Sequence, residues 1–531
     1  MKRFLCTLLT ACLLIGCCGM LAASASEAEL ETRSLTVQPG SDVTSLNFNW
    51  ITLGSPYESV VEIAPASKDF ESTKRMVIGT YAKTSFTAQN ENGETVSLVS
   101  NKVTVTDLEP DTAYKYRVGD GERWSKTYTV RTGHPKWVSA YVVSDVHIIS
   151  SEVNQDLQIS IDNWEQTLQQ LDDLGEADLI LSIGDQMQNA TKLSYLEGFF
   201  NHSLLAEFAL APIDGNHDVS PASKNWPSYV NLPNSTKGGS VNGIGDYFFK
   251  QGNVLFVMLS LTDVNFGDGT HEKVFKEAIK AYPDYDWMVV CLHESIYGLY
   301  MHNQANLGNA DPEDYHEDIY DPYIATIEKY GADLVLTGHS HNYSRSYFMK
   351  NGEIQEVEQD EDGVYIDPTG TVWVEMGTAH RTGGWALGQS AKPGFPWPWL
   401  DYYYSASTGV CSYAILETYM DTLTLTGYKL LEEDAVLDTL TISKSGAGQS
   451  KNNDKPAQEN PTNKPSTDNQ EQEPPVDTPD TPVDTPDTPT EPQPSANRGT
   501  LWIVLGCVSA AAIGVIAYAL VLLGKKNAKK D

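Results

Sequence analysis

Cysteine is scarce in this chain, with seven in 531 residues, four of them before residue 19. A fifth, Cys507, lies in an apolar run near the C-terminus, so only Cys291 and Cys411 remain between the two ends. A chain with so few cysteines is not a disulfide-stapled scaffold. Two interpretations stay open for the remaining pair, one disulfide bridge or two inert thiols. The apolar strand around Cys291 favours thiols.

Basic residues are also few, 36 Lys and Arg against 71 Asp and Glu, which gives a net charge of −35. Binding to nucleic acid needs a basic face, so this charge balance argues against that class of function. At 531 residues the chain is too long for one core, and we expect two or more domains with tails.

The N-terminus has the pattern of a secretory signal peptide. Two basic residues precede an apolar run from Phe4 to Leu21, and small residues end at Ala25, so we expect a signal peptide over residues 1–25. Residues 14–17 also match a bacterial lipoprotein processing box, which would leave Cys17 lipidated. That alternative stays open.

The C-terminal region predicts a membrane anchor. Residues 501–524 form an uncharged apolar run long enough to span a bilayer, and the lysine-rich tail 525–531 indicates a cytoplasmic C-terminus. Residues 446–498 are rich in Pro, Thr and Asp and predict a disordered stalk. No sortase-type Leu-Pro-x-Thr-Gly motif precedes the apolar run, so we expect a retained membrane helix rather than linkage to the cell wall. We therefore expect an exported, single-pass protein on the surface of a bacterial cell.

Residues 34–133 predict a small all-β domain, because short apolar or alternating runs such as 46–50 and 114–118 are separated by turn residues. The domain resembles a fibronectin type III sandwich, on the early Trp50 and the stretch 108–118. The resemblance implies that Tyr114 is its corner tyrosine. We favour a structural spacer as its role over glycan or protein binding.

Residues 136–445 change to strands alternating with helices, which predicts a mixed α/β domain. One helix has an apolar face through Trp164 and is stopped by Gly175. We expect three further segments to be antiparallel strands that close the domain: Val372–Glu375, Tyr413–Glu417 and Thr422–Tyr428. The expected strands that end on polar motifs are Trp137–Ser144, Leu179–Ile183, Phe208–Ile213, Trp287–Leu292 and Asp333–Thr337.

Each of those five strands is followed by a short polar motif. Carboxyl ends of strands are where α/β sheets build their sites, and Asp, Asn and His offer oxygen and nitrogen donors for divalent metals. Any one such motif means little, but five in series form a specific signal. The motifs are Asp145-Val-His147, Gly184-Asp185, Gly215-Asn216-His217-Asp218, His293 and Gly338-His339-Ser-His341.

In order and spacing these motifs resemble the calcineurin-like metallophosphoesterase family, whose pattern is D-x-H, G-D, G-N-H-[DE], H, G-H-x-H. The resemblance covers residues 136–445 and implies a four-layer α-β-β-α sandwich. It also implies hydrolysis of phosphate mono- or diesters by attack of a metal-bound hydroxide on phosphorus.

The resemblance further implies which residues hold two metal ions. The ions would lie about 3.5–4 Å apart and share Asp185. His217 would protonate the leaving group, and Asp218 would orient its ring. The first ion would be held by Asp145, His147 and His341 with Asp185, and the second by Asn216, His293 and His339 with Asp185.

Two features narrow the resemblance to a subgroup of this family. The block His341-x-Tyr343-x-Arg345 resembles purple acid phosphatases, which often carry a fibronectin-like domain in front. Those enzymes typically have a tyrosine four positions past the Gly of the G-D motif and lack the histidine that His147 provides; here the tyrosine position is Gln188. We therefore expect a colourless site with Fe, Mn, Zn or a mixture.

Candidates for substrate contact are weaker, and packing explains each of them at least as well. Packing is also the favoured role of Tyr343 and Arg345. The rival function is a surface-binding, adhesin-like protein with an idle phosphoesterase fold, although no expected metal ligand is missing. The weaker candidates are the segments 297–309, 378–381, 395–399 and 402–404.

Overall fold

The computed structural model describes residues 30–447, except for 55–56, 80–83, 91, 150–156, 176, 178, 220–224, 237–242, 261–269, 299–320, 381–397, 405–409, 433–434 and 446. The predicted signal peptide (1–25), membrane helix (501–524) and basic tail (525–531) lie outside the described residues, as does the stalk (446–498) but for residue 447. Among the helices of the described part, none is both long and apolar enough to cross a membrane.

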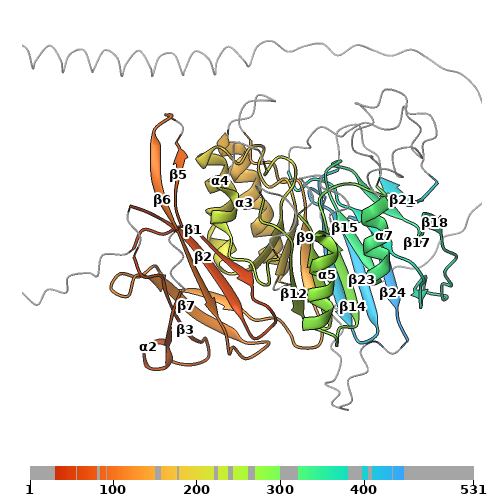
Figure 1. Cartoon of the computed structure of the whole chain (residues 1–531), viewed down its shortest axis with the longest axis horizontal. Coiled ribbons are helices and arrows are strands. Elements are labelled where there is room, and N and C mark those ends of the chain that lie inside the picture. The colour runs from red at the N-terminus through yellow and green to blue at the C-terminus, as the bar shows by residue number, and fades with distance from the viewer. Residues whose placement is uncertain are drawn as a thin grey trace, which may run out of the picture. The chain divides into compact units, whose positions relative to one another are not determined.

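Two large sheets dominate the described residues (Figure 1). In the first sheet the strand order is β19 (Tyr365–Ile366), β24 (Val436–Ser443), β23 (Thr422–Lys429), β22 (Ser412–Tyr419), β9 (Ser139–Val143), β10 (Leu179–Ile183), β11 (Ala209–Ile213), β1 (Arg33–Pro39), β2 (Leu46–Leu53), β6 (Thr95–Val105) and β5 (Thr84–Gln89). In the second sheet it is β12 (Tyr247–Gln251), β13 (Val254–Met258), β14 (Trp287–Cys291), β15 (Leu334–Thr337), β20 (Val372–Glu375), β16 (Tyr343–Ser346) and β21 (Leu400–Tyr404).

Two smaller sheets and several helices complete the described part. One small sheet contains β4 (Arg75–Ile78), β3 (Val60–Pro65), β7 (Ala113–Gly119) and β8 (Tyr128–Arg131), and the other pairs β17 (Met349–Lys350) with β18 (Glu353–Ile354). The α-helices are α2 (Phe70–Thr73), α3 (Leu157–Leu174), α4 (Leu193–Phe200), α5 (Thr270–Ala281) and α7 (Asp321–Tyr330). Short 3-10 turns cover Ser203–Ala206 and Trp226–Tyr229.

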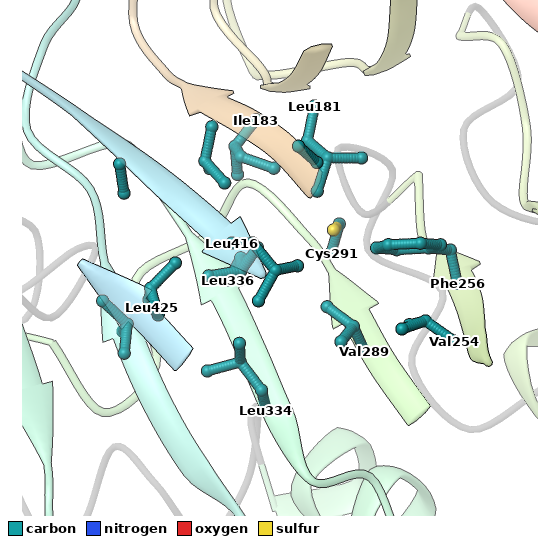
Figure 2. Close-up of a cluster of buried hydrophobic side chains, with 14 of the residues drawn as sticks. Leu181, Ile183, Val254, Phe256, Val289, Cys291, Leu334, Leu336, Leu416 and Leu425 are labelled. Carbon is teal, nitrogen blue, oxygen red and sulfur yellow. The ribbon is translucent and has the colours of Figure 1, made fainter. Parts of the chain in front are cut away.

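The main hydrophobic core lies between the two large sheets. Alternate residues of a strand point to one face, and this period is visible in β14, where Val289 and Cys291 join this core while Met288 and Val290 join another. Figure 2 shows Leu181 and Ile183 of β10 near side chains of the second sheet. Trp164 and Leu168 of α3 pack on the first sheet's other face, and Phe275 of α5 packs on the second's.

The central strands of both sheets are parallel, as the alternation of strands and helices predicts. β9, β10 and β11 run parallel in one sheet, and β13, β14, β15 and β20 in the other. The carboxyl ends of these strands therefore gather at common edges, where the polar motifs follow them.

One strand prediction was wrong in orientation. Val372–Glu375 is not an antiparallel closing strand: β20 pairs parallel to β15, with Leu334 opposite Val372, and antiparallel to β16. All four of its residues are buried, as in an interior strand. β22 and β23 do form the predicted antiparallel pair. Cys291 and Cys411 are thiols that form no disulfide with each other, so the favoured interpretation was right and the disulfide alternative was wrong.

The N-terminal all-β domain has the predicted corner contact but is not separate from the α/β domain. The backbone N–H of Glu109 donates to the Tyr114 hydroxyl over 2.8 Å, and Trp50 is fully buried. However, β1 pairs parallel to β11 through Val37 and Ala209, so β1, β2, β5 and β6 extend the first large sheet. The two domains therefore share one sheet.

Candidate metal centre

The polar motifs meet at the carboxyl ends of five strands from both large sheets. Asp145 and His147 follow β9, Asp185 follows β10, and Asn216 with His217 follows β11. The second sheet supplies His293 after β14 and His339 with His341 after β15. Because the sheets pack face to face, ligands distant in the sequence come together.

The backbone at this edge adopts a conformation that side chains disfavour at several of the motif residues. Five residues of the motifs have positive φ, which is uncommon for residues with a side chain and gathers at functional sites. The glycines allow close approach. A Cβ on Gly184 would lie 2.3 Å from His293 Nδ1, and one on Gly215 would lie 2.2 Å from Asp185 Oδ1. The five positive-φ residues are Asp145, His147, Asp185, His339 and His341.

Asp145, His147 and His341 form the first candidate ligand group, with one ligand atom from each within 4.8 Å of the others. The two Nε2 atoms lie 3.0 Å apart, and Asp145 Oδ1 lies 3.7 Å from His147 Nε2 and 3.3 Å from His341 Nε2. The other carboxylate oxygen, Oδ2, accepts from Ser144 Oγ (2.5 Å) and from the backbone N–H of His339 (3.0 Å). Asp145 is therefore held with Oδ1 toward the histidines.

Asp185, His293 and His339 form a second group by the same criterion. His293 Nδ1 donates to the Ile183 carbonyl over 2.8 Å, which leaves Nε2 facing Asp185 Oδ2 at 3.1 Å. Asn216 Oδ1 lies 2.9 Å from His339 Nδ1, so the amide oxygen joins this group.

Asp185 belongs to both halves of the site. Its Oδ2 lies 3.6 Å from His147 Nε2 and 3.1 Å from His293 Nε2. Its Oδ1 accepts from the backbone N–H of His217 at 2.8 Å, which ties it to the third motif. The Asp185 side chain thus lies between the imidazoles of the two groups.

Charges at the site favour anionic carboxylates among imidazoles. Burial raises the pKa of Asp145, but the adjacent imidazoles of His147 and His341 outweigh it and hold this pKa well below its usual range. Burial acts in the same direction on Asp185, where attraction to His293 and His147 outweighs it and lowers the pKa. For His293 burial lowers the pKa, and attraction to Asp185 raises it further than burial lowers it.

The donor set fits divalent metal ions. Two donor atoms here, Asp145 Oδ1 and His293 Nε2, are buried and make no hydrogen bond. Buried polar atoms almost always have a hydrogen-bond partner, so these two atoms need another kind of partner. A bound cation would be such a partner. Imidazole, carboxylate and amide donors suit Zn, Fe or Mn.

His217 and Asp218 take places that differ from part of the prediction. His217 is half-buried, and its Nδ1 lies 3.1 Å from the backbone oxygen of Gln188. Asp218 is fully buried, and its carboxylate accepts backbone N–H groups of Gly215 (2.8 Å), Met187 (3.2 Å) and Gln186 (3.3 Å). The structure shows no hydrogen bond between Asp218 and the His217 ring, whose Nδ1 faces the Gln188 backbone oxygen instead. Asp218 instead fixes two loops of the site.

Sequence reasoning did not predict the supporting roles of three residues. Ser144 Oγ bonds to Asp145, Thr378 Oγ1 donates to the Asp145 carbonyl over 2.6 Å, and Gln188 Oε1 lies 3.1 Å from His147 Nδ1. No local pattern marks Ser144 or Thr378, because their partners are set by packing. Gln188 was noticed only as the place of an expected tyrosine.

The weaker candidates for substrate contact fall partly outside the described residues. Residues 299–309, 381 and 395–397 lie outside the described residues. His380 is nearly buried, and burial together with repulsion from His147 and His341 lowers its pKa to about 4. It therefore lies near the first ligand group as a neutral imidazole.

Arg345 and Tyr343 pack inside the domain, as we favoured. Arg345 forms a fork with both oxygens of Asp438 (2.7 and 3.1 Å) and also contacts Asp401. A Cβ added to Gly427 would lie 2.6 Å from the Tyr343 hydroxyl, which shows how tightly that ring is enclosed. These contacts join β16 to β21 and β24.

We expect Arg345→Met to lower the free energy of unfolding by about 3–5 kcal/mol, because it leaves the Asp438 carboxylate buried without its partner. Urea denaturation would measure this change. Arg123→Met is the control, since Arg123 is 52% exposed and pairs with Asp120 three residues away, and it should cost less than about 1 kcal/mol. Equal effects of the two changes would contradict a structural role for the Arg345 fork.

Comparison with known proteins gives the class of each domain. Residues 32–132 match the N-terminal domain of purple acid phosphatases, and residues 139–343 match the calcineurin-like phosphoesterases. The chain therefore joins a calcineurin-like phosphoesterase domain to an N-terminal domain of the purple acid phosphatase type.

Individual relatives agree with these two matches. Purple acid phosphatase 15 of Arabidopsis thaliana is 25% identical over 324 residues, which cover 56% of each chain. An uncharacterized protein of Mycobacterium tuberculosis is 27% identical over 159 residues, or 26% of this chain and 28% of that one. The match thus spans about half the length of the first relative and less of the second.

Among solved structures, a purple acid phosphatase from yellow lupin (Lupinus luteus) seeds has a similar fold. The TM-score is 0.59 with 16% identity, over 78% of this chain and 75% of that one. At this identity the likeness shows the fold alone.

Proposed function

We propose that this protein is an exported, membrane-tethered phosphoesterase that hydrolyses phosphate mono- or diesters at a centre of two metal ions. The observation that carries the proposal is the arrangement of two ligand groups around Asp185, whose Oδ2 lies 3.6 Å from His147 and 3.1 Å from His293. A carboxylate between two groups of imidazoles suits a pair of cations. The family of the α/β domain supports the same chemistry.

The candidate ligands form two cation positions that share one carboxylate. When bound, two cations neutralise the charge of the phosphoryl oxygens and lower the pKa of water. Asp145, His147 and His341 would hold one cation, Asn216, His293 and His339 the other, and Asp185 both. Because Asn216 is exposed, the second position opens toward solvent and substrate.

His217 is the candidate proton donor for the leaving group. Its Nδ1 faces a carbonyl oxygen, which only accepts hydrogen bonds, so the proton at Nδ1 is engaged. In the imidazolium form, Nε2 would carry the second proton, which is the one available to the leaving group. A positioned imidazole contributes about 10²–10⁴-fold to such a proton transfer. Asp218 contributes indirectly, by fixing the loop that carries His217.

The metal and the location remain part of the proposal. Gln188 occupies the position where a purple centre would have a tyrosine, so a colourless pair of Fe, Mn or Zn ions is proposed. The signal pattern in residues 1–25 and the apolar run 501–524 support export and a single membrane anchor. The proline-rich segment 446–498 would carry the enzyme away from the membrane.

Hydrolysis of p-nitrophenyl phosphate and bis-p-nitrophenyl phosphate tests the proposal. We expect the purified protein, loaded in turn with Mn²⁺, Zn²⁺ or Fe²⁺, to hydrolyse at least one of them, and the ratio of rates assigns mono- or diester preference. Bound metal without hydrolysis of either would indicate a narrower substrate. Absence of both metal and hydrolysis would contradict the proposal and favour the adhesin-like alternative.

A further inference from the structure

Gln188 lies between two imidazoles of the candidate metal centre and contacts both. Its side-chain oxygen Oε1 lies 3.1 Å from Nδ1 of His147, and its backbone oxygen lies 3.1 Å from Nδ1 of His217. Its own backbone N–H donates to the Ile148 carbonyl over 3.1 Å, next to an isolated parallel β-bridge between Ile148 and Met187. The backbone thus fixes Gln188 where its side chain reaches His147.

This contact determines which nitrogen of His147 can bind a cation. An amide oxygen has no proton to give, so a hydrogen bond to it requires the proton of neutral His147 on Nδ1. The lone pair is then on Nε2, the atom 3.7 Å from Asp145 Oδ1 and 3.6 Å from Asp185 Oδ2. The opposite tautomer would direct a proton at those ligands.

The tautomer of His293 is fixed in the same way, but by a backbone carbonyl instead of a side chain. Its Nδ1 donates to the Ile183 carbonyl, and its Nε2 faces Asp185. Metal-binding histidines almost always donate their second N–H to a carbonyl or carboxylate, which fixes the ring and the tautomer. At His147 a side chain performs this task, so it can be removed by mutation.

We infer that Gln188 is a positioning residue for the first metal position: its side-chain oxygen orients His147 so that Nε2 binds the ion. The inference rests on the proposed function, because it assumes that metal ions occupy the two ligand groups. It gives Gln188 a role of its own at the position where the resemblance led us to look for a tyrosine.

Metal binding by the full-length protein tests this role without reference to catalysis. Calorimetric titration of the metal-free protein with Zn²⁺, and separately with Mn²⁺, would be compared for Gln188→Leu, Gln188→Glu and the unaltered chain. We expect Gln188→Leu to weaken one of two binding steps by about 10–100-fold, the usual effect of losing such a partner. Gln188→Glu should bind at least as tightly as the unaltered chain, since a carboxylate also accepts from Nδ1.

Gln355→Leu is the matched control, because Gln355 is also half-buried and its amide bonds to the Glu353 carbonyl. It should leave both binding steps unchanged, and thermal melting of the metal-free proteins should show all variants folded. Unchanged binding in Gln188→Leu would overturn the inference. So would weaker binding in Gln188→Glu than in Gln188→Leu, which would mean that the amide N–H donates to the ring.

The outcomes also separate this inference from the proposed function. Hydrolysis by the unaltered protein, with Gln188→Leu binding metal normally, would overturn only the role of Gln188. Two bound ions without phosphoesterase activity, with weakened binding in Gln188→Leu, would support the positioning role and contradict the proposed substrate class. A protein that binds no metal would overturn both.

Discussion

Replacing Asp185 by asparagine is expected to abolish hydrolysis, lowering kcat/KM for p-nitrophenyl phosphate by at least about 10³-fold, or about 4 kcal/mol in the activation free energy. The change keeps the size of the side chain and removes its charge. Asp185 Oδ2 is the oxygen that reaches both His147 and His293, so one substitution affects both ligand groups. The same variant should lose bound metal, measured by elemental analysis after dialysis.

Asp284→Asn is the control for this experiment. The Asp284 side chain is 75% exposed, and it pairs with Lys250, so the same chemical change on the surface should leave the rate and the metal content unaltered. Full activity of the Asp185→Asn protein, with two metal ions retained, would contradict the assignment of Asp185 as the shared ligand.

The sequence predicted that the candidate ligands lie together, because each motif directly follows a buried strand. Strands such as Leu179–Ile183 are short apolar runs with matching bounds in the structure, and a parallel sheet brings their ends together. The motifs thus predicted the common location of the candidate ligands, and their assignment as metal ligands stays a prediction.

Local sequence patterns did not predict the contacts between segments that are distant in the sequence. The apolar pattern of Val372–Glu375 is the same for a parallel and an antiparallel strand, and only its position between β15 and β16 decides the orientation. Asp218 was assigned to the ring of His217 by resemblance, but backbone N–H groups of Gly215, Gln186 and Met187 occupy its carboxylate. Such choices depend on tertiary packing.

The pairing of the N-terminal domain with the α/β domain was also not predicted from the sequence, where we favoured a structural spacer as its role. Its strands β1, β2, β5 and β6 belong to the sheet of the α/β domain. The Tyr116 hydroxyl donates to the Ala206 carbonyl over 2.6 Å, and Ala88 with Leu98 packs in the core that contains Met187. Nothing in residues 34–133 alone indicates that a partner strand lies beyond residue 200.

A chain that begins at residue 136 is therefore expected to lose soluble expression and metal-dependent hydrolysis. Removing β1 turns β11 into a sheet edge whose five residues are all buried in the intact protein, and an apolar edge strand promotes aggregation. The truncation also removes the Ser100 hydroxyl and the Lys102 ammonium, which bond to the carbonyls of Ser228 (2.6 Å) and Pro227 (2.9 Å).

The matched control is a chain that ends at Asn453. Residues up to 453 form one compact unit, so this truncation should keep the melting temperature and the hydrolysis rate of the folded part. Soluble yield, thermal melting and hydrolysis of p-nitrophenyl phosphate would be compared for the two truncations. A soluble and active chain beginning at residue 136 would show that the α/β domain folds alone and that the N-terminal domain is a spacer after all.

Removing the N-terminal domain should disturb the metal centre directly, because β11 leads into the motif Gly215–Asp218. On the far side of that motif, the Asn231 amide donates to the carbonyls of Phe48 and Val103 in the N-terminal domain, over 3.3 and 3.2 Å. The segment with Asn216 and His217 is thus held between two attachments to that domain. If a truncated protein can be refolded, it should bind the second metal ion more weakly than the chain ending at Asn453.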